Sequence, residues 1–139
     1  MKKHVANAIW KGSVDEGSGN ITTRSKALNN APYSKAGRFA DGPGTNPDEL
    51  IAASHAGCFA MALSMFLGKE GYTPEALEVK AEVTMDPGKL QLVGSHLTLH
   101  AKIPGISEAK LLECANTAKD NCPISKALNM PITLDVHLV

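Results

Sequence analysis

The sequence predicts an α+β fold in which antiparallel β-sheets wrap around one long, buried central helix. Residues 51–68 form the most apolar stretch of the chain, and helix-capping signals precede it. Three later segments alternate between apolar and polar residues, which is typical of antiparallel strands with one buried face and one wet face. With 139 residues, the chain is expected to form a single domain over residues 1–139.

The N-terminal part predicts short strands and turns. The segment GSGNITTRS places glycine and asparagine before a β-branched run, which favours a hairpin. Residues 30–49 then form a long segment rich in proline and glycine, and loops of this length often carry function. Arg38 lies in this segment and is a candidate functional residue, although a loop arginine is more often simply solvated.

The long helix is predicted to begin after Asn46 and to run to Lys69. Asn46 suits the N-cap and Pro47 suits the first helical position, while Gly71 can end the helix. Asn46 and Glu49 also have the spacing of a capping box, in which the Glu49 carboxylate reaches back to the amide of Asn46.

Two faces of this helix differ in composition. One face holds Cys58 together with Ile51, Ser54, His55, Met61, Ala62 and Met65, and the other holds only small residues, namely Ala53, Gly57, Ala60 and Ser64. Small residues let another helix or strand approach closely, which explains Gly57 despite its cost of about 1 kcal/mol in mid-helix. We therefore expect a helix buried on most sides of a soluble protein rather than one that crosses a membrane.

The C-terminal half predicts three strands and two helices. Residues 77–85, 96–103 and 132–138 alternate between apolar and polar side chains and are expected to be antiparallel strands. Residues 107–121 form a second amphipathic helix, and Pro123 opens a short third one.

The three cysteines are too few for a secreted disulfide scaffold, and the chain has no C-x-x-C pair. Cys114 shares a helical stripe with Leu111 and is expected to be core. Cys122 precedes Pro123 and should lie at a helix N-cap, so local physics predicts it to be the more acidic thiol and Cys58 the hidden one. The alternative for Cys58 is that it is only a small side chain packed in the core. His55 is likewise expected to be a core histidine whose ring is satisfied by a carbonyl.

Composition and charge exclude several classes of function. The 14 basic and 14 acidic residues balance, and the basic ones are scattered, so nucleic-acid binding is not expected. The N-terminus lacks the apolar core of a signal peptide, so we expect a cytoplasmic protein. No second ligand spacing accompanies His55 and Cys58, and a metal site is therefore not expected.

The sequence resembles the OsmC branch of the OsmC/Ohr family of thiol peroxidases. The likeness runs from Trp10 to the terminal strand through YSKAGRFADGPGTNPDELIAASHAGCFAMALSMFL, IPGIS and NCPISKAL, and the motifs HAGCF and NCPIS are specific in this order and spacing. It implies an obligate, intertwined homodimer with active sites at the subunit interface.

The resemblance implies that Cys58 is the peroxidatic nucleophile and Cys122 the resolving cysteine. It also implies that Arg38 and Glu49 form the polar pair that holds and activates the Cys58 thiolate. A straight helix turns through about 180° between Glu49 and Cys58, so this carboxylate would have to come from a partner chain or a folded-back loop.

The implied reaction is the reduction of organic hydroperoxides to alcohols, through a sulfenic acid on Cys58 and an intrachain disulfide. An external dithiol, either a lipoylated protein or a thioredoxin-type partner, would restore the thiols, and no metal or organic cofactor is needed. From the helix stripe we infer that Phe39, Met61 and Met65 line the substrate site and favour organic peroxides. The alternatives are a general thiol–disulfide oxidoreductase and a non-catalytic, stress-induced binding dimer whose cysteines are only core.

Overall fold

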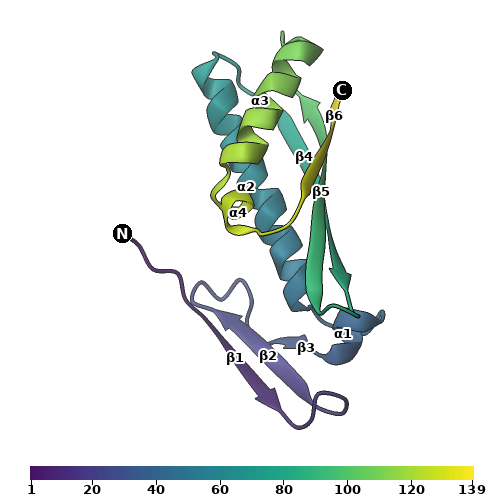
Figure 1. Cartoon of the computed structure of the whole chain (residues 1–139). Coiled ribbons are helices and arrows are strands. Elements are labelled where there is room, and N and C mark those ends of the chain that lie inside the picture. The colour runs from purple at the N-terminus through teal and green to yellow at the C-terminus, as the bar shows by residue number, and fades with distance from the viewer. The chain divides into compact units, whose positions relative to one another are not determined.

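The computed structural model describes residues 1–139 and shows a mixed α+β fold with two three-stranded sheets and a long helix, as predicted (Figure 1). The elements follow in the order β1 (Ala6–Lys11), β2 (Ser18–Thr23), β3 (Ala31–Tyr33), α1 (Lys35–Phe39), α2 (Pro47–Lys69), β4 (Ala76–Asp86), β5 (Gln91–Lys102), α3 (Glu108–Asn121), α4 (Pro123–Ala127) and β6 (Ile132–Leu138). Contacts divide the chain into two compact units, residues 1–50 and 51–139.

The first unit contains an antiparallel sheet in the order β1-β2-β3, followed by α1. The predicted hairpin is the β1–β2 pair, in which Ala6 lies opposite Thr23. The segment of residues 30–49, expected to be a loop, contains β3 and α1. The Ser34 hydroxyl caps α1 by accepting a hydrogen bond from the amide of Gly37 at 3.2 Å. The many prolines and glycines around this serine favour the prediction of a loop and mask its capping role.

The second unit contains a sheet in the order β4-β5-β6, and its strands have the predicted alternation. β4 and β5 are antiparallel, but β6 runs parallel to β5, with Leu97 opposite Leu134, so the expectation of a wholly antiparallel sheet is wrong. The reason is the connection: the chain passes through α3 and α4 before it returns, and such a crossover brings the next strand back in the same direction.

The core of this unit lies between its helices and its sheet. Phe59, Leu63 and Leu67 come from α2, Leu97 and Leu99 come from β5, and Leu111, Ala115 and Ala118 come from α3. α3 runs along α2 beside the sheet, as the ribbon shows (Figure 1). Both helices have nearly the predicted bounds, and Ser107 caps α3 by accepting the amide of Lys110 at 3.1 Å.

α2 is buried on one side only, so the expectation of burial on most sides is wrong for the chain described here. Its buried residues are His55, Phe59, Leu63 and Leu67, which recur at every fourth position. Met61 and Met65 are 77% and 51% exposed, and a Cβ added at Gly57 would meet no atom within 4 Å. By length and composition α2 could also cross a membrane, but the core helix of a soluble protein passes the same test.

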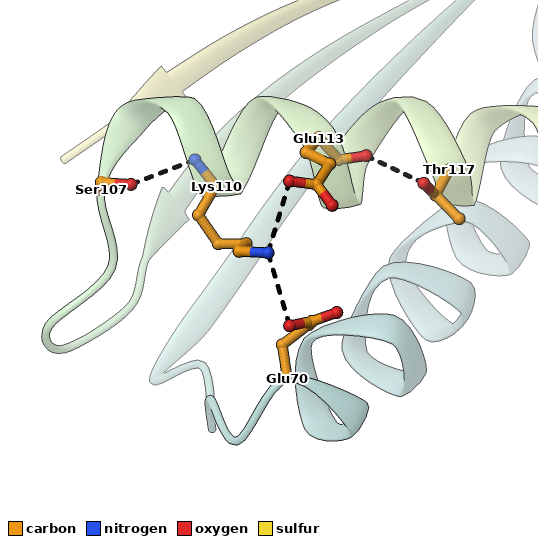
Figure 2. A network of polar contacts seen from close by, with 5 residues as sticks. All are labelled: Glu70, Ser107, Lys110, Glu113 and Thr117. Carbon is orange, nitrogen blue, oxygen red and sulfur yellow. Dashed lines mark hydrogen bonds and ion pairs between the residues drawn. The ribbon is translucent and has the colours of Figure 1, made fainter.

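An ion-pair network joins the end of α2 to the start of α3 (Figure 2). Lys110 Nζ lies 3.4 Å from a carboxylate oxygen of Glu70 and 3.3 Å from one of Glu113. Hydrogen bonds first to Glu113 and then to Glu70 raise the pKa of Lys110, so its charge is retained. The side chains of the network are largely exposed to solvent, so it contributes little to stability.

Candidate active site

Cys58 and Cys122 lie next to each other within the second unit. Their sulfur atoms are 2.7 Å apart, and either thiol can donate the hydrogen bond between them. α2 carries Cys58, while Cys122 is at once the C-cap of α3 and the N-cap of α4. A disulfide needs sulfur atoms about 2.05 Å apart. The two thiols can therefore form one with a small movement.

The two thiols differ in exposure, in the opposite sense to the prediction. Cys122 is fully buried, whereas Cys58 is partly exposed, so the expectation that Cys58 is the hidden thiol is wrong. Cys58 follows His55 by three positions on α2 and therefore lies at the edge of the buried face rather than in its middle. A reagent in solvent thus reaches the sulfur of Cys58 first.

The pKa values of the pair move apart. Burial raises the pKa of the Cys58 thiol above its ordinary value of 9.0, and the hydrogen bond and charge of Cys122 raise it further, while the backbone of Ile124 lowers it. Burial also raises the pKa of Cys122, but hydrogen bonds from Cys58, Ser125 and Ile124 outweigh it, so the net pKa of Cys122 is lowered. The prediction that Cys122 is the more acidic thiol agrees with this direction.

His55 is fully buried, and serine hydroxyls rather than the predicted carbonyl satisfy its ring. Its Nδ1 atom lies 2.7 Å from the Ser95 hydroxyl and its Nε2 atom lies 2.8 Å from the Ser125 hydroxyl. Neither serine was identified from the sequence. The only available signal was the place of Ser125 three residues after the N-cap Cys122. Cys114 is buried among core residues, as predicted.

Arg38 and Glu49 belong to the first unit and do not pair with each other there. The Arg38 guanidinium makes two hydrogen bonds of 3.0 Å to the carboxylate of Asp48. Glu49 instead accepts the Thr45 hydroxyl at 2.6 Å. Only half of the predicted capping box is formed, because the Asn46 side chain accepts the amide of Glu49 at 2.9 Å but the Glu49 carboxylate is held by Thr45. Asp48 is an acidic residue in the first turn of α2, where negative charge is ordinary.

An apolar hollow of about 340 Å³ lies within the first unit. It is lined by Trp10, Val14, Tyr33, Ser34, Lys35, Arg38, Phe39 and Pro47. The rings of Trp10 and Tyr33 pack at 5.4 Å, and the Arg38 guanidinium lies 5.8 Å from the centre of the Phe39 ring. Phe39 thus lines a hollow beside a positive charge, whereas Met61 and Met65 lie on the exposed side of α2.

Possible metal ligands are not clustered: no group of three or more His, Cys, Asp or Glu side chains could hold a metal ion. The chemistry that the described residues can supply is that of the paired thiols. A buried acidic thiol lies in contact with a more exposed one, which is an arrangement able to cycle between dithiol and disulfide.

Comparison with known proteins identifies the family of the chain. The family model described as OsmC-like protein matches residues 40–137. The chain is 39% identical over 133 residues to Peroxiredoxin OsmC of Escherichia coli, covering 94% of this chain and 93% of that protein. It is also 33% identical over 99 residues to the organic hydroperoxide resistance protein OhrA of Bacillus subtilis, covering 66% and 67% of the two chains.

Solved structures show the same fold. A crystal structure of an OsmC-like protein from Mycoplasma pneumoniae matches with a TM-score of 0.79 at 16% identity, covering 99% of this chain and 98% of that one. An organic hydroperoxide resistance protein OsmC from Legionella pneumophila matches with a TM-score of 0.72 at 22% identity, covering 99% and 97%. Together with the family match and the Escherichia coli relative, these findings show that the chain belongs to the OsmC family.

Proposed function

We propose that this chain is a cysteine peroxidase that reduces organic hydroperoxides and so acts in the defence against peroxide stress. The observation that carries the proposal is the contact of the Cys58 and Cys122 sulfurs at 2.7 Å, with the first partly exposed and the second buried. Relatives named as a peroxiredoxin and as organic hydroperoxide resistance proteins support the same class of reaction.

In the first step the Cys58 thiolate attacks the distal oxygen of the hydroperoxide. A sulfur–oxygen bond forms, the oxygen–oxygen bond breaks, and the departing alkoxide takes up a proton to give the alcohol. Cys58 is thereby oxidised to a sulfenic acid. The pKa of Cys122 is lowered and that of Cys58 is raised, so the charge of the pair lies mainly on Cys122, and Cys58 gives its proton to solvent before its thiolate attacks.

In the second step the Cys122 thiolate attacks the Cys58 sulfur. The disulfide bond forms, the sulfur–oxygen bond breaks, and the departing hydroxide takes a proton to become water. A dithiol from outside the chain, of the lipoyl or thioredoxin type, then reduces the disulfide and is itself oxidised. A reducing compartment such as the cytoplasm fits this cycle.

We further propose that Arg38 supplies the positive charge that the Cys58 thiolate needs, with Glu49 as its partner in the active state. The raised pKa of Cys58 supports this need, since an arginine guanidinium beside a thiol lowers its pKa. Arg38 would then exchange its bonds to Asp48 for ones to Glu49, from the same chain or from a second copy in a homodimer. Phe39, Met61 and Met65 are proposed to contact the organic part of the substrate.

The test is consumption of cumene hydroperoxide in the presence of a dithiol. Cys58→Ser is expected to abolish turnover, because it removes the attacking sulfur, while the matched change Cys114→Ser in the core should retain turnover. After one equivalent of peroxide, mass spectrometry should find a peptide that links Cys58 to Cys122. Unchanged turnover in Cys58→Ser would end the peroxidase proposal, and a linkage through Cys114 would reverse the assignment of roles.

The partial exposure of Cys58 favours one second candidate, a general thiol–disulfide oxidoreductase. Such an enzyme would reduce a small disulfide such as a glutathione dimer about as fast as it consumes cumene hydroperoxide. A peroxidase reacts with the peroxide faster by orders of magnitude, so a direct comparison of the two substrates separates these functions.

A further inference from the structure

A chain of hydrogen bonds runs from the buried face of the sheet to Ser125, three residues after Cys122. It begins at Ser95 on β5, passes through His55 on α2, and ends at Ser125 on α4, with distances of 2.7 and 2.8 Å from the ring nitrogens to the two hydroxyls. Ser95, His55 and Ser125 are 2%, 0% and 8% exposed. A polar network this deeply buried in a small core is costly unless every member is satisfied, and here each is.

The ring of His55 donates one of its two hydrogen bonds to the serines and accepts the other. Burial lowers the pKa of His55 below its ordinary 6.5, so the ring is neutral at neutral pH. A neutral imidazole has one N–H donor and one nitrogen that accepts. One serine hydroxyl must therefore donate to the ring while the other accepts from it.

We propose that His55 is a positioning residue that orients the Ser125 hydroxyl toward Cys122 and so stabilises the thiolate of the resolving cysteine. In this arrangement the Ser95 hydroxyl donates to Nδ1, and the Nε2–H of His55 donates to the Ser125 oxygen. The hydrogen of the Ser125 hydroxyl is then free to be donated to the Cys122 sulfur at the start of the same helix. The assignment of a resolving role to Cys122 rests on the proposed function, but the orientation of Ser125 does not.

The surroundings of Cys122 support this direction. Ser125 is the third residue of α4, and Cys122 is the N-cap. Both the amide and the hydroxyl of Ser125 lower the pKa of Cys122 against the effect of burial, and Cys58 is the one titratable group that also acts on it. The sulfur accepts no capping hydrogen bond of ordinary geometry. The Ser125 contact is thus expected to tighten when the sulfur becomes charged.

A stabilised Cys122 thiolate serves both halves of the proposed cycle. When Cys122 attacks the sulfenic acid, the hydroxyl favours the ionised, nucleophilic form. When an external dithiol attacks the more exposed Cys58 sulfur of the disulfide, Cys122 is the leaving group, and a thiolate of lower pKa leaves faster. The same hydroxyl therefore also directs the reductant to Cys58.

The first experiment isolates Cys122 by replacing the other two cysteines in Cys58→Ser/Cys114→Ser. The pKa of Cys122 is then read from thiolate ultraviolet absorbance against pH, which needs no reagent to reach the buried sulfur. Because hydrogen bonds to charged groups are among the strong ones, Ser125→Ala is expected to reduce the thiolate fraction about tenfold or more at a pH below the pKa. Ser125→Thr keeps the hydroxyl and should restore most of that fraction.

The second experiment asks whether His55 acts through Ser125. His55→Phe keeps a ring but removes both hydrogen bonds, so it should lower the thiolate fraction when Ser125 is present and have no further effect in Ser125→Ala. His55→Gln, whose amide can donate, is the milder variant if the ring change prevents folding. Ser107→Ala, which removes a cap far from Cys122, controls for loss of stability.

Two results would overturn the proposal: an unchanged Cys122 pKa in Ser125→Ala, or an equal effect of His55→Phe with and without the Ser125 hydroxyl. Failure of the peroxidase assay would leave the proposed role of His55 and Ser125 unaffected, since the titration measures the pKa of Cys122 alone. A further readout is single-turnover disulfide formation after peroxide, which Ser125→Ala should slow about tenfold.

Discussion

The contact between Cys58 and Cys122 predicts that each thiol controls the acidity of the other. Burial raises the pKa of Cys58, and the hydrogen bond and charge of Cys122 raise it further. Cys122→Ser removes the ionisable neighbour and leaves a hydroxyl that can donate to a Cys58 thiolate. We expect Cys58 to react with iodoacetamide several-fold faster at neutral pH in this variant, as followed by peptide mapping.

The control for this change is Cys114→Ser, because Cys114 is core and does not act on the pKa of Cys58. Its Cys58 alkylation rate should match that of the unmodified chain. Slower alkylation of Cys58 in Cys122→Ser would show that Cys122 lowers the pKa of its neighbour rather than raising it.

His55 predicts a pH dependence of stability. Its folded-state pKa lies below the ordinary 6.5, so the unfolded chain takes up a proton that the folded chain does not. The stability contributed by the neutral ring is complete above about pH 6.5 and is lost as the pH falls below it. We expect the free energy of unfolding in urea to decrease between about pH 7 and pH 5, by up to about 1.4 kcal/mol per pH unit from this group.

His55→Gln removes the titration while keeping a group that can donate and accept, so its unfolding free energy should fall less steeply over the same interval. The other histidines are present in both proteins and cancel in the comparison. Equal slopes would show that His55 is protonated in the folded state or that its environment is polar.

At the scale of single residues, the sequence predicts what depends on neighbours in the chain. Pro123 locates Cys122 at a helix start, and the N-cap position predicts an acidic thiol. Ser95 and Ser125 are 40 and 70 residues away from His55, and no local pattern indicates that they meet its ring. The pairing of Arg38 with Asp48 was likewise missed, because Asp48 has an ordinary role in the first turn of a helix.

At the scale of elements, capping residues predict helix bounds well and alternation predicts strands well. Neither signal shows whether two paired strands run parallel or antiparallel, so the parallel pairing of β6 with β5 could not be predicted from residues 132–138. Nor does composition distinguish a helix covered on every side from one whose small residues remain open. The exposed Met61 and Gly57 on α2 are the example.

The two hydroxyls on α3 in Figure 2 give a test of capping at this scale. Ser107 accepts the Lys110 amide at the N-cap, whereas Thr117 donates to the Glu113 carbonyl in mid-helix. Ser107→Ala leaves a helix-end amide without a partner and should cost about 1 kcal/mol in urea unfolding. Thr117→Ala removes a hydroxyl from the same helix but improves helix propensity, so it should be neutral or slightly stabilising. Equal losses would contradict the capping argument.

At the scale of the whole molecule, one side of α2, which carries Gly57, Met61 and Met65, is exposed although it is built from small and apolar residues. Met61 and Met65 are exposed there, and the open surroundings of Gly57 mean that its small size serves no contact within the second unit. Small and apolar residues on an open helix face suit close approach by another protein surface. The homodimer predicted from the sequence would give Gly57 the packing role that it lacks here.

Met61→Lys tests this arrangement, because a charge placed in an apolar subunit contact must lose its hydration without gaining a partner. We expect the unmodified chain to have twice the mass of one chain in light scattering, and Met61→Lys to have the mass of one chain or to dissociate on dilution. Leu112→Lys is the matched control, since Leu112 is also an exposed apolar residue, 50% accessible, but lies on α3. It should remain a dimer. A monomeric unmodified chain, or a dimer that Met61→Lys leaves intact, would mean that this side of α2 contacts no second copy.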